Sequence, residues 1–318
     1  MRVDPEQFDI TCRRPQVVLF GNGLNYNEKF KWAKLLYSVE AEGFDRSPFC
    51  SDCSYSSEDK IDERIPFSIY ASISSPVEDN IRSKNIINQL EKYDYTKLDH
   101  LKRIADIAAD AYLTTNYTYD LEASIKKDVQ EISSKTISKY RKVIRYSKSF
   151  KGTSEKYLLH TYNSFRHNGI EKKIWHIHGD MKVPNSMILT LDDYARHIGK
   201  LVECNALAGN KYDKFSSSLK ITSWMDYFIV ADIYILGLGF DYSEFDLWWL
   251  LARRQREKDQ SLLGKIRYYD HDNTEGNKMK HKMLQSFGVD VQTIPLNCDG
   301  YDAHYTACID AIERDISI

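Results

Sequence analysis

Short apolar runs that end at glycine or polar turns alternate along the chain with longer segments of helical period. The run over residues 16–20 (QVVLF) ends at Gly21, and residues 30–39 then place apolar side chains at helical spacing. A buried strand that passes through a glycine turn into a helix typically opens a nucleotide-binding parallel sheet. The same reasoning predicts strands at 112–117, 136–146, 174–178, within 228–238, at 265–269 and at 290–294, and helices at 80–92, 98–111 and 243–255.

Strands that alternate with helices define the fold class. We expect an α/β fold with a Rossmann-like, mostly parallel sheet that carries helices on both faces. A length of 318 residues fits one large domain with insertions. Residues 1–318 are therefore predicted to form a single domain, with an irregular, polar stretch at 40–75 inside an insertion at about 40–111, and a helical, basic insertion at about 123–173.

The composition is that of an ordinary globular protein, with 42% hydrophobic and 28% charged residues, which excludes collagenous and fully disordered chains. No apolar run approaches the ~20 residues that span a bilayer, and the first residues lack the apolar segment of a secretion signal. We therefore expect a cytoplasmic protein with no membrane partner and with reduced cysteines. The CxxC at Cys50 and Cys53 has no second ligand pair at zinc-finger spacing, so we interpret it as two loop thiols.

The net charge of −2 hides a strongly basic stretch. Residues 123–173 hold thirteen Lys and Arg against four Asp and Glu. Such a stretch attracts nucleic acid or an anionic ligand, but charge runs have low specificity. We favour a solvated insertion, and leave open whether it contacts nucleic acid, a partner or its own neighbour in an oligomer.

Two glycine turns follow predicted strands. The turn from Gly21 to Asn25 (GNGLN) lets the backbone approach a pyrophosphate, but it matches neither GxGxxG nor a Walker loop, so a plain tight turn is an equal alternative. The turn from Gly237 to Asp241 (GLGFD) suits the opposite wall of a dinucleotide crevice. Asp241 and Asp246 suit ligand hydroxyls, although Asp246 also suits the start of a helix in a capping box with Ser243.

Asn116 and His178 are the candidate catalytic residues. Asn116 ends a strand in TTNY, where its amide can orient a water or a ribose hydroxyl, although Asn also forms turns at strand ends. His178 precedes Gly179 at a strand end, where an imidazole suits a general base. His176 is expected on the same strand face, so a metal pair is an alternative, but no further ligands are evident and His176 alone suits a core position.

The order of these motifs resembles the bacterial sirtuin-like family of NAD-consuming proteins. The resemblance spans about residues 16–250 and is strongest at TTNY, HG and LGLGFDYSEFD. It is carried by GNGLN from Gly21, TTNY with DLE from Thr114 to Glu122, IHGD from Ile177, ILTLDDY from Ile188 and LGLGFDYSEFD from Leu236. The resemblance implies a Rossmann-like sheet with NAD across the carboxyl ends of its strands. It also implies an antiphage effector that hydrolyses NAD to ADP-ribose and nicotinamide.

The resemblance also implies roles for individual residues. The family's motif asparagine corresponds to Asn116, which would position water or a ribose hydroxyl, and its motif histidine to His178, which would act as base or ribose partner. No metal is expected. The expected NAD-binding residues lie in the two glycine turns and in the TTNY region, namely Gly21, Asn22, Gly23, Asn25, Thr115, Asp120, Gly237, Gly239 and Asp241.

The sequence departs from the family at two points. Sirtuin deacylases carry two CxxC pairs after the HG motif, which form a zinc ribbon, and this chain has none there. The family also often has Asp two residues after the motif Asn, where this chain has Thr118, and Asp120 is the candidate to replace it.

These observations favour an NAD⁺ glycohydrolase (NADase) that depletes NAD⁺ in antiphage defence by abortive infection. An NAD-dependent protein deacylase and a non-catalytic sensor of NAD or ADP-ribose are the alternatives. The chain ends about 70 residues after the last motif. We therefore expect the trigger to be self-assembly into a homo-oligomer or a separately encoded sensor or ATPase partner.

Overall fold

The computed structural model of the chain describes residues 2–25, 32–49, 65–75, 79–91, 99–125, 133–137, 157–204, 212–213, 218–257, 259–297 and 300–316. Much of the predicted basic insertion, including most of the strand expected at 136–146, lies outside these residues, as do Cys50 and Cys53. The single-domain organisation stays a prediction.

Strands and helices alternate along the described chain. The strands are β1 (Arg2–Val3), β2 (Glu6–Asp9), β3 (Gln16–Phe20), β4 (Ala111–Thr114), β5 (Ser133–Ile137), β6 (Thr161–His167), β7 (Ile170–His176), β8 (Tyr212–Asp213), β9 (Ser218–Ile221), β10 (Asp232–Leu236), β11 (Ile266–Asp270) and β12 (Asp290–Thr293). The helices are α1 (Trp32–Ser38), α2 (Phe67–Ser74), α3 (Asp79–Leu90), α4 (Asp99–Asp106), α5 (Asp120–Ile125), α6 (Leu191–Cys204), α8 (Trp224–Val230), α9 (Phe245–Gln255), α10 (Glu275–Ser286) and α11 (Gly300–Ile316). Short 3-10 helices are η1 (Asn22–Asn25), η2 (Ser47–Phe49), η6 (Pro184–Ser186) and η7 (Gln260–Leu262).

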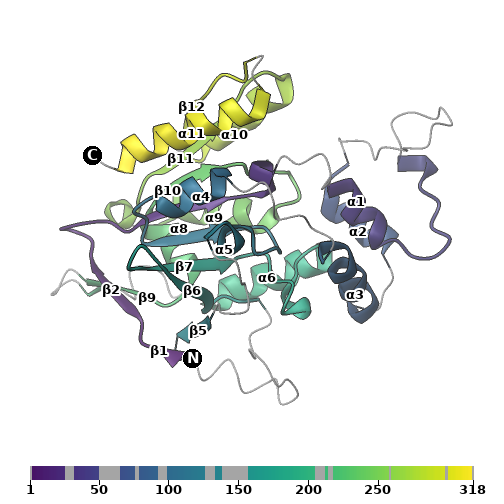
Figure 1. Cartoon of the computed structure of the whole chain (residues 1–318), viewed down its shortest axis with the longest axis horizontal. Coiled ribbons are helices and arrows are strands. Elements are labelled where there is room, and N and C mark those ends of the chain that lie inside the picture. Colours follow the sequence, from purple (N-terminus) through teal and green to yellow (C-terminus); the bar gives the residue numbers. More distant parts are fainter. Residues whose placement is uncertain are drawn as a thin grey trace.

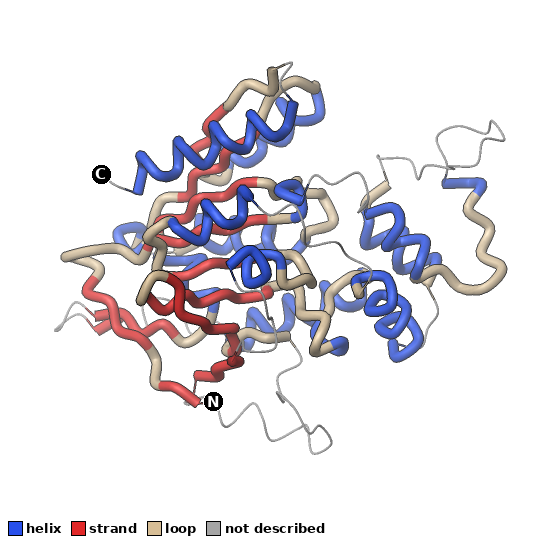
Figure 2. Tube along the Cα trace, viewed as in Figure 1, coloured by secondary structure: helices blue, strands red, loops and turns tan. Residues whose placement is uncertain are grey.

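A central sheet organises the described residues. Nine of their strands follow the order β1-β5-β6-β7-β4-β3-β10-β11-β12, and β2, β9 and β8 form a small antiparallel sheet. The six strands from β7 to β12 in the central order are parallel, whereas β6 is antiparallel to both its neighbours. Figures 1 and 2 show this sheet among its helices, with α11 at one end and β1 at the other. The predicted Rossmann-like, mostly parallel sheet is confirmed.

Side chains that alternate along the parallel strands build a core on each face of the sheet. Val17 and Leu19 of β3 belong to the core that includes residues of α6, α8, α9 and α10, whereas Val18 and Phe20 belong to the core that includes residues of α4, α5 and α11. A strand that is covered on both faces has apolar residues at consecutive positions. This explains why β3 has the sequence QVVLF. A third core joins α1, α2 and α3 and includes Tyr117. These three helices lie side by side at the right of Figure 1.

Some predicted boundaries are wrong, for physical reasons. The strand expected within 228–238 is confirmed as β10, and residues 228–230 before it end helix α8, whose seven residues are all buried. The helix expected at 98–111 ends at Asp106. Strand β6, whose sequence TYNSFRH is largely polar, was not predicted, and α2 lies in the stretch interpreted as irregular.

The helix expected at 243–255 begins at Phe245, with Glu244 as its N-cap. The predicted capping box of Ser243 and Asp246 does not form. The hydroxyl of Ser243 instead donates to Asp241, and the carboxylate of Asp246 binds other partners.

The two glycine turns meet where β3 and β10 lie side by side. The N–H of Gly23 donates to the carbonyl of Gly237 at 2.8 Å. A Cβ on Gly21 or Gly23 would lie 2.7 Å from the same carbonyl oxygen. The order of the parallel strands reverses between β3 and β10, and open α/β sheets bind ligands at such a point. The absence of a side chain at these glycines therefore allows the two turns to pack against each other.

Replacing Gly237 by Ala is expected to lower the free energy of unfolding by about 1–3 kcal/mol. Gly237 has a φ of +61°, and a Cβ there would lie 2.7 Å from Cγ of Leu24. Gly239→Ala is the matched control, because nothing lies within 4 Å of its Cβ position, and its expected effect is below ~0.5 kcal/mol. Urea denaturation measures both, and equal midpoints for the two variants would contradict this assignment.

Candidate active site

Asn116 lies in the loop after β4, with its side chain held in one orientation. Its Nδ2 donates to Oδ2 of Asp120 at 2.9 Å, and the hydroxyl of Thr118 donates to the same oxygen at 2.7 Å. The amide oxygen of Asn116 is buried and has no hydrogen-bond partner among the described residues. Asp120 thus links Thr118 to Asn116, and the arrangement leaves Oδ1 of Asn116 as a buried acceptor for a ligand.

His178 follows β7 and is paired with a buried carboxylate. Its Nε2 lies 3.0 Å from Oδ2 of Asp246 in the first turn of α9, and Nδ1 of His197 lies 3.1 Å from the same oxygen. These three side chains are at most 5% exposed. Burial lowers the pKa of His178, but the charge and hydrogen bond of Asp246 outweigh it, so the net shift is upward. Burial also lowers the pKa of His197, which favours its neutral form.

Glu244, which the sequence pattern did not single out, is a buried carboxyl that interacts electrostatically with His178. Burial, together with the negative charges of Asp246 and Asp241, raises the pKa of Glu244 to about 8, against the lowering effect of His178. Its Oε2 is buried without a hydrogen-bond partner among the described residues. A carboxyl that is largely protonated at neutral pH can donate a hydrogen bond. The only sequence signal was its place between Asp241 and Asp246.

Hydrogen bonds join the loop that carries Asn116 to the loop that carries His178. The N–H of Ile177 donates to the carbonyl of Thr114 at 2.8 Å, and the N–H of Met181 donates to the carbonyl of Tyr117 at 3.1 Å. Gly179, at a φ of +107°, lets the second loop turn, and a Cβ there would lie 2.5 Å from Cα of Met187. The two loops therefore form one unit at the carboxyl ends of the neighbouring strands β4 and β7.

His176 and His178 do not act as a pair. Strand β7 ends at His176, whose Nε2 lies 3.0 Å from Glu122 of α5, whereas His178 binds Asp246 of α9. The expectation that both histidines lie on one strand face is wrong, because the strand ends between them. The described residues contain no group of three or more His, Cys, Asp or Glu suited to a metal ion.

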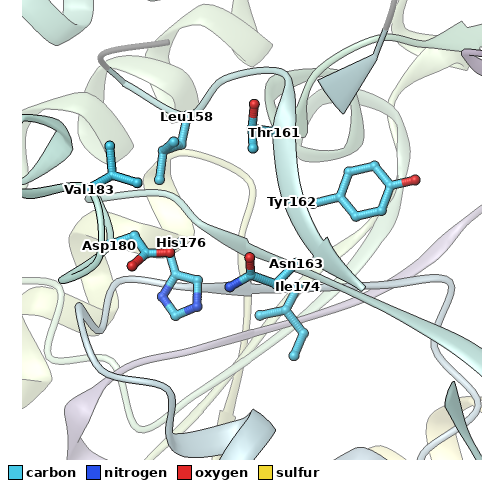
Figure 3. A pocket seen from close by; sticks show the side chains of 8 residues that line it. All are labelled: Leu158, Thr161, Tyr162, Asn163, Ile174, His176, Asp180 and Val183. Carbon is cyan, nitrogen blue, oxygen red and sulfur yellow. The ribbon is translucent and has the colours of Figure 1, made fainter. Parts of the chain in front are cut away.

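A small pocket borders His176 (Figure 3). Polar side chains of β6, β7 and the HGD loop line it together with apolar ones. The lining residues are Leu158, Thr161, Tyr162, Asn163, Ile174, His176, Asp180 and Val183.

The predicted NAD-binding residues fall into three groups. Gly21, Gly23 and Gly237 come together, with Asn22 in the turn η1, while the side chain of Asn25 lies outside the described part of the structure. Thr115 and Asp120 are buried beside Asn116. Gly239 and Asp241 lie beyond the second turn, where the carbonyl of Gly239 accepts from Lys280 and Asp241 accepts from the N–H of Ser243.

The mostly parallel sheet with helices on both faces makes the chain an α/β protein of Rossmann-like type. Residues 110–290 match the sequence profile of the SIR2-like domain, and the chain belongs to this family. The SIR2-like domain is typical of NAD-dependent enzymes, which points to an NAD-related activity. No curated protein matches the chain. None of the described helices has the length and apolar character that a membrane span requires.

Asp246→Asn is expected to lower the free energy of unfolding by about 3–5 kcal/mol, the usual cost of breaking a buried ion pair. The pKa of Asp246 is lowered. Its contribution to the free energy of unfolding is therefore present above pH 3.8, the ordinary pKa of an aspartate, and is lost as the pH falls through the shifted pKa. The pKa of His178 is raised. Its contribution to the free energy of unfolding is therefore present below pH 6.5, the ordinary pKa of a histidine, and is lost as the pH rises through the shifted pKa. The loss of stability in Asp246→Asn should therefore be largest between pH 3.8 and pH 6.5.

The control is Asp302→Asn, which breaks the pair of His100 with an aspartate that is 93% exposed. An exposed pair is worth at most about 1 kcal/mol. Denaturant unfolding at pH 5 and at pH 9 measures both variants. A cost for Asp246→Asn that equals the control, or that does not change with pH, would contradict the assignment.

Proposed function

We propose that the chain is an NAD⁺ glycohydrolase that cleaves NAD⁺ to ADP-ribose and nicotinamide, with Asn116 and His178 in catalytic roles. One observation carries the proposal: a buried asparagine with a free amide oxygen and a histidine paired with a carboxylate follow neighbouring parallel strands on joined loops. Membership of the SIR2-like family supports NAD as the substrate.

The buried amide oxygen of Asn116 is the part of the site that fits this substrate. Because Asp120 holds Nδ2, Oδ1 is left to accept a hydrogen bond from water or from a ribose hydroxyl. The glycine turns at the centre of the sheet lie where a pyrophosphate is held in related folds. Their close packing means that backbone groups at the rim of the turns, rather than space between them, would contact the phosphates.

The reaction breaks the bond between C1′ of the ribose and the nicotinamide nitrogen. The electron pair of that bond passes to the pyridinium ring, which leaves as neutral nicotinamide, so no strong acid is needed. Water then adds to C1′ of the oxocarbenium-like ribose, and its proton passes to neutral His178 as general base. Asp246 stabilises the imidazolium that results. Asn116 orients the water or the ribose hydroxyl next to it.

The biological role that we propose is depletion of NAD⁺ in antiphage defence, which the resemblance to sirtuin-like effectors supports. Uncontrolled loss of NAD⁺ would kill the host cell. An inactive resting state, released by homo-oligomerisation or by a separately encoded partner, is therefore part of the proposal.

The first test is product analysis of the purified chain with NAD⁺. Wild type should release nicotinamide and ADP-ribose. Asn116→Ala should reduce kcat on the order of 100- to 1000-fold, and His178→Ala on the order of 100- to 10,000-fold. His167→Ala is the matched control, because His167 pairs with Asp106 at the amino end of β7 and should leave turnover unchanged.

Calorimetry on the same samples separates the alternatives. Intact NAD⁺ with measurable binding would favour the sensor, and intact NAD⁺ without binding would overturn an NAD site altogether. Turnover only in the presence of an acylated peptide would favour the deacylase.

A further inference from the structure

Each ring nitrogen of His176 has an oxygen within hydrogen-bond distance. Its Nδ1 lies 2.8 Å from the backbone carbonyl oxygen of Asn116, and its Nε2 lies 3.0 Å from Oε1 of Glu122. A carbonyl accepts only, and so does a carboxylate. Neutral imidazole carries one N–H, so it can satisfy only one of these acceptors. Beside a Glu122 carboxylate, only the imidazolium form of His176 donates to both acceptors at once.

The surroundings of His176 favour this charged form. Glu122 is 1% exposed and also accepts from Nδ2 of Asn163 at 3.1 Å. Asp180 is the second carboxylate near His176. Tyr119 lies with its ring centroid 5.3 Å from that of His176 and donates its hydroxyl to Asp180. Burial alone lowers the pKa of His176, but the two carboxylates and the carbonyl raise it to about 9.

The pocket in Figure 3 lies beside this cluster, and residues of β6 form part of its lining. His176, Asp180 and Asn163 all contribute side chains to its lining. The pocket therefore places His176, Asp180 and Asn163 around one small cavity.

We propose that Glu122 and His176 form a positioning pair that holds the backbone of Asn116 in the orientation that NAD⁺ cleavage needs. This inference rests on the proposed function. Asp120 holds the side chain of Asn116, and the charged pair holds its carbonyl, so the residue is fixed at both ends. When His176 loses a proton, one of its two hydrogen bonds is lost, and the carbonyl of Asn116 competes with the charged acceptor Glu122. Release of this carbonyl loosens the loop and slows the reaction.

A histidine that merely fills the core would give a different result. Its replacement would change stability but would leave the pH dependence of turnover in the remaining folded protein unaltered. The pH profile of kcat therefore separates positioning from packing.

The experiment compares wild type, Glu122→Gln and Asp106→Asn from pH 6 to pH 10, with folding checked by circular dichroism at each pH. Wild-type kcat should fall as the pH rises through about 9. Glu122→Gln removes the charge that stabilises the imidazolium, so the fall should begin at lower pH. At pH 8 we expect kcat of this variant to be reduced on the order of 10- to 100-fold with a smaller change in KM. Asp106→Asn breaks the surface pair with His167 and should match wild type.

A second readout needs neither a variant nor NAD⁺. In nitrogen-15 spectra of histidine-labelled wild type, His176 should keep both ring protons up to about pH 9. A neutral His176 at pH 7 overturns the positioning pair, and so does a Glu122→Gln enzyme with the wild-type profile. If wild type releases no nicotinamide although His176 titrates near pH 9, the proposed function fails while the imidazolium bridge to Asn116 stands.

Discussion

The candidate site depends on the hydrogen bonds that join the loop after β4 to the loop after β7. Backbone bonds from Ile177 and Met181, and the imidazole of His176, all reach carbonyls between Thr114 and Tyr117. Neighbouring parallel strands deliver the two loops to the same edge of the sheet, and these bonds, with the one from the hydroxyl of Tyr119 to Asp180, fix one loop relative to the other. Asn116 and His178 can act on one substrate only if this unit is rigid, since small displacements are costly in catalysis.

Two buried pairs of histidine and carboxylate lie on this unit, His176 with Glu122 and His178 with Asp246. Removing charges from water is expensive, so such pairs are weak evidence for stability and stronger evidence for a function that needs a charge at a defined place. We assign different tasks to them. The pair of His176 and Glu122 keeps its charge during the reaction and holds the backbone carbonyl of Asn116. The pair of His178 and Asp246 gains or loses a proton during the reaction.

The sequence predicts the parallel sheet well and the site only in part. Apolar runs such as QVVLF, followed by glycine, indicate strands and loops at the correct edge, whereas the fully buried α8 has no amphipathic period and resembles a strand. Asn116 and His178 are candidates that the motif order indicates, and their catalytic roles stay a prediction. The contacts of Glu122 with His176 and of Asp246 with His178 and His197 were not predicted, because the residues of each contact lie 49 or more positions apart and only the fold brings them together. The pairing of the two glycine turns is also a tertiary contact without a local signal.

The most direct test of the account is a crystal structure of the His178→Ala variant with NAD⁺ bound. The account predicts that the nicotinamide ribose lies at the carboxyl ends of β4 and β7, with a ribose hydroxyl or a water on C1′ donating to Oδ1 of Asn116. It also predicts that the pyrophosphate lies beside the glycine turns after β3 and β10. NAD⁺ bound at another place, or a ribose that does not contact Asn116, would contradict the account.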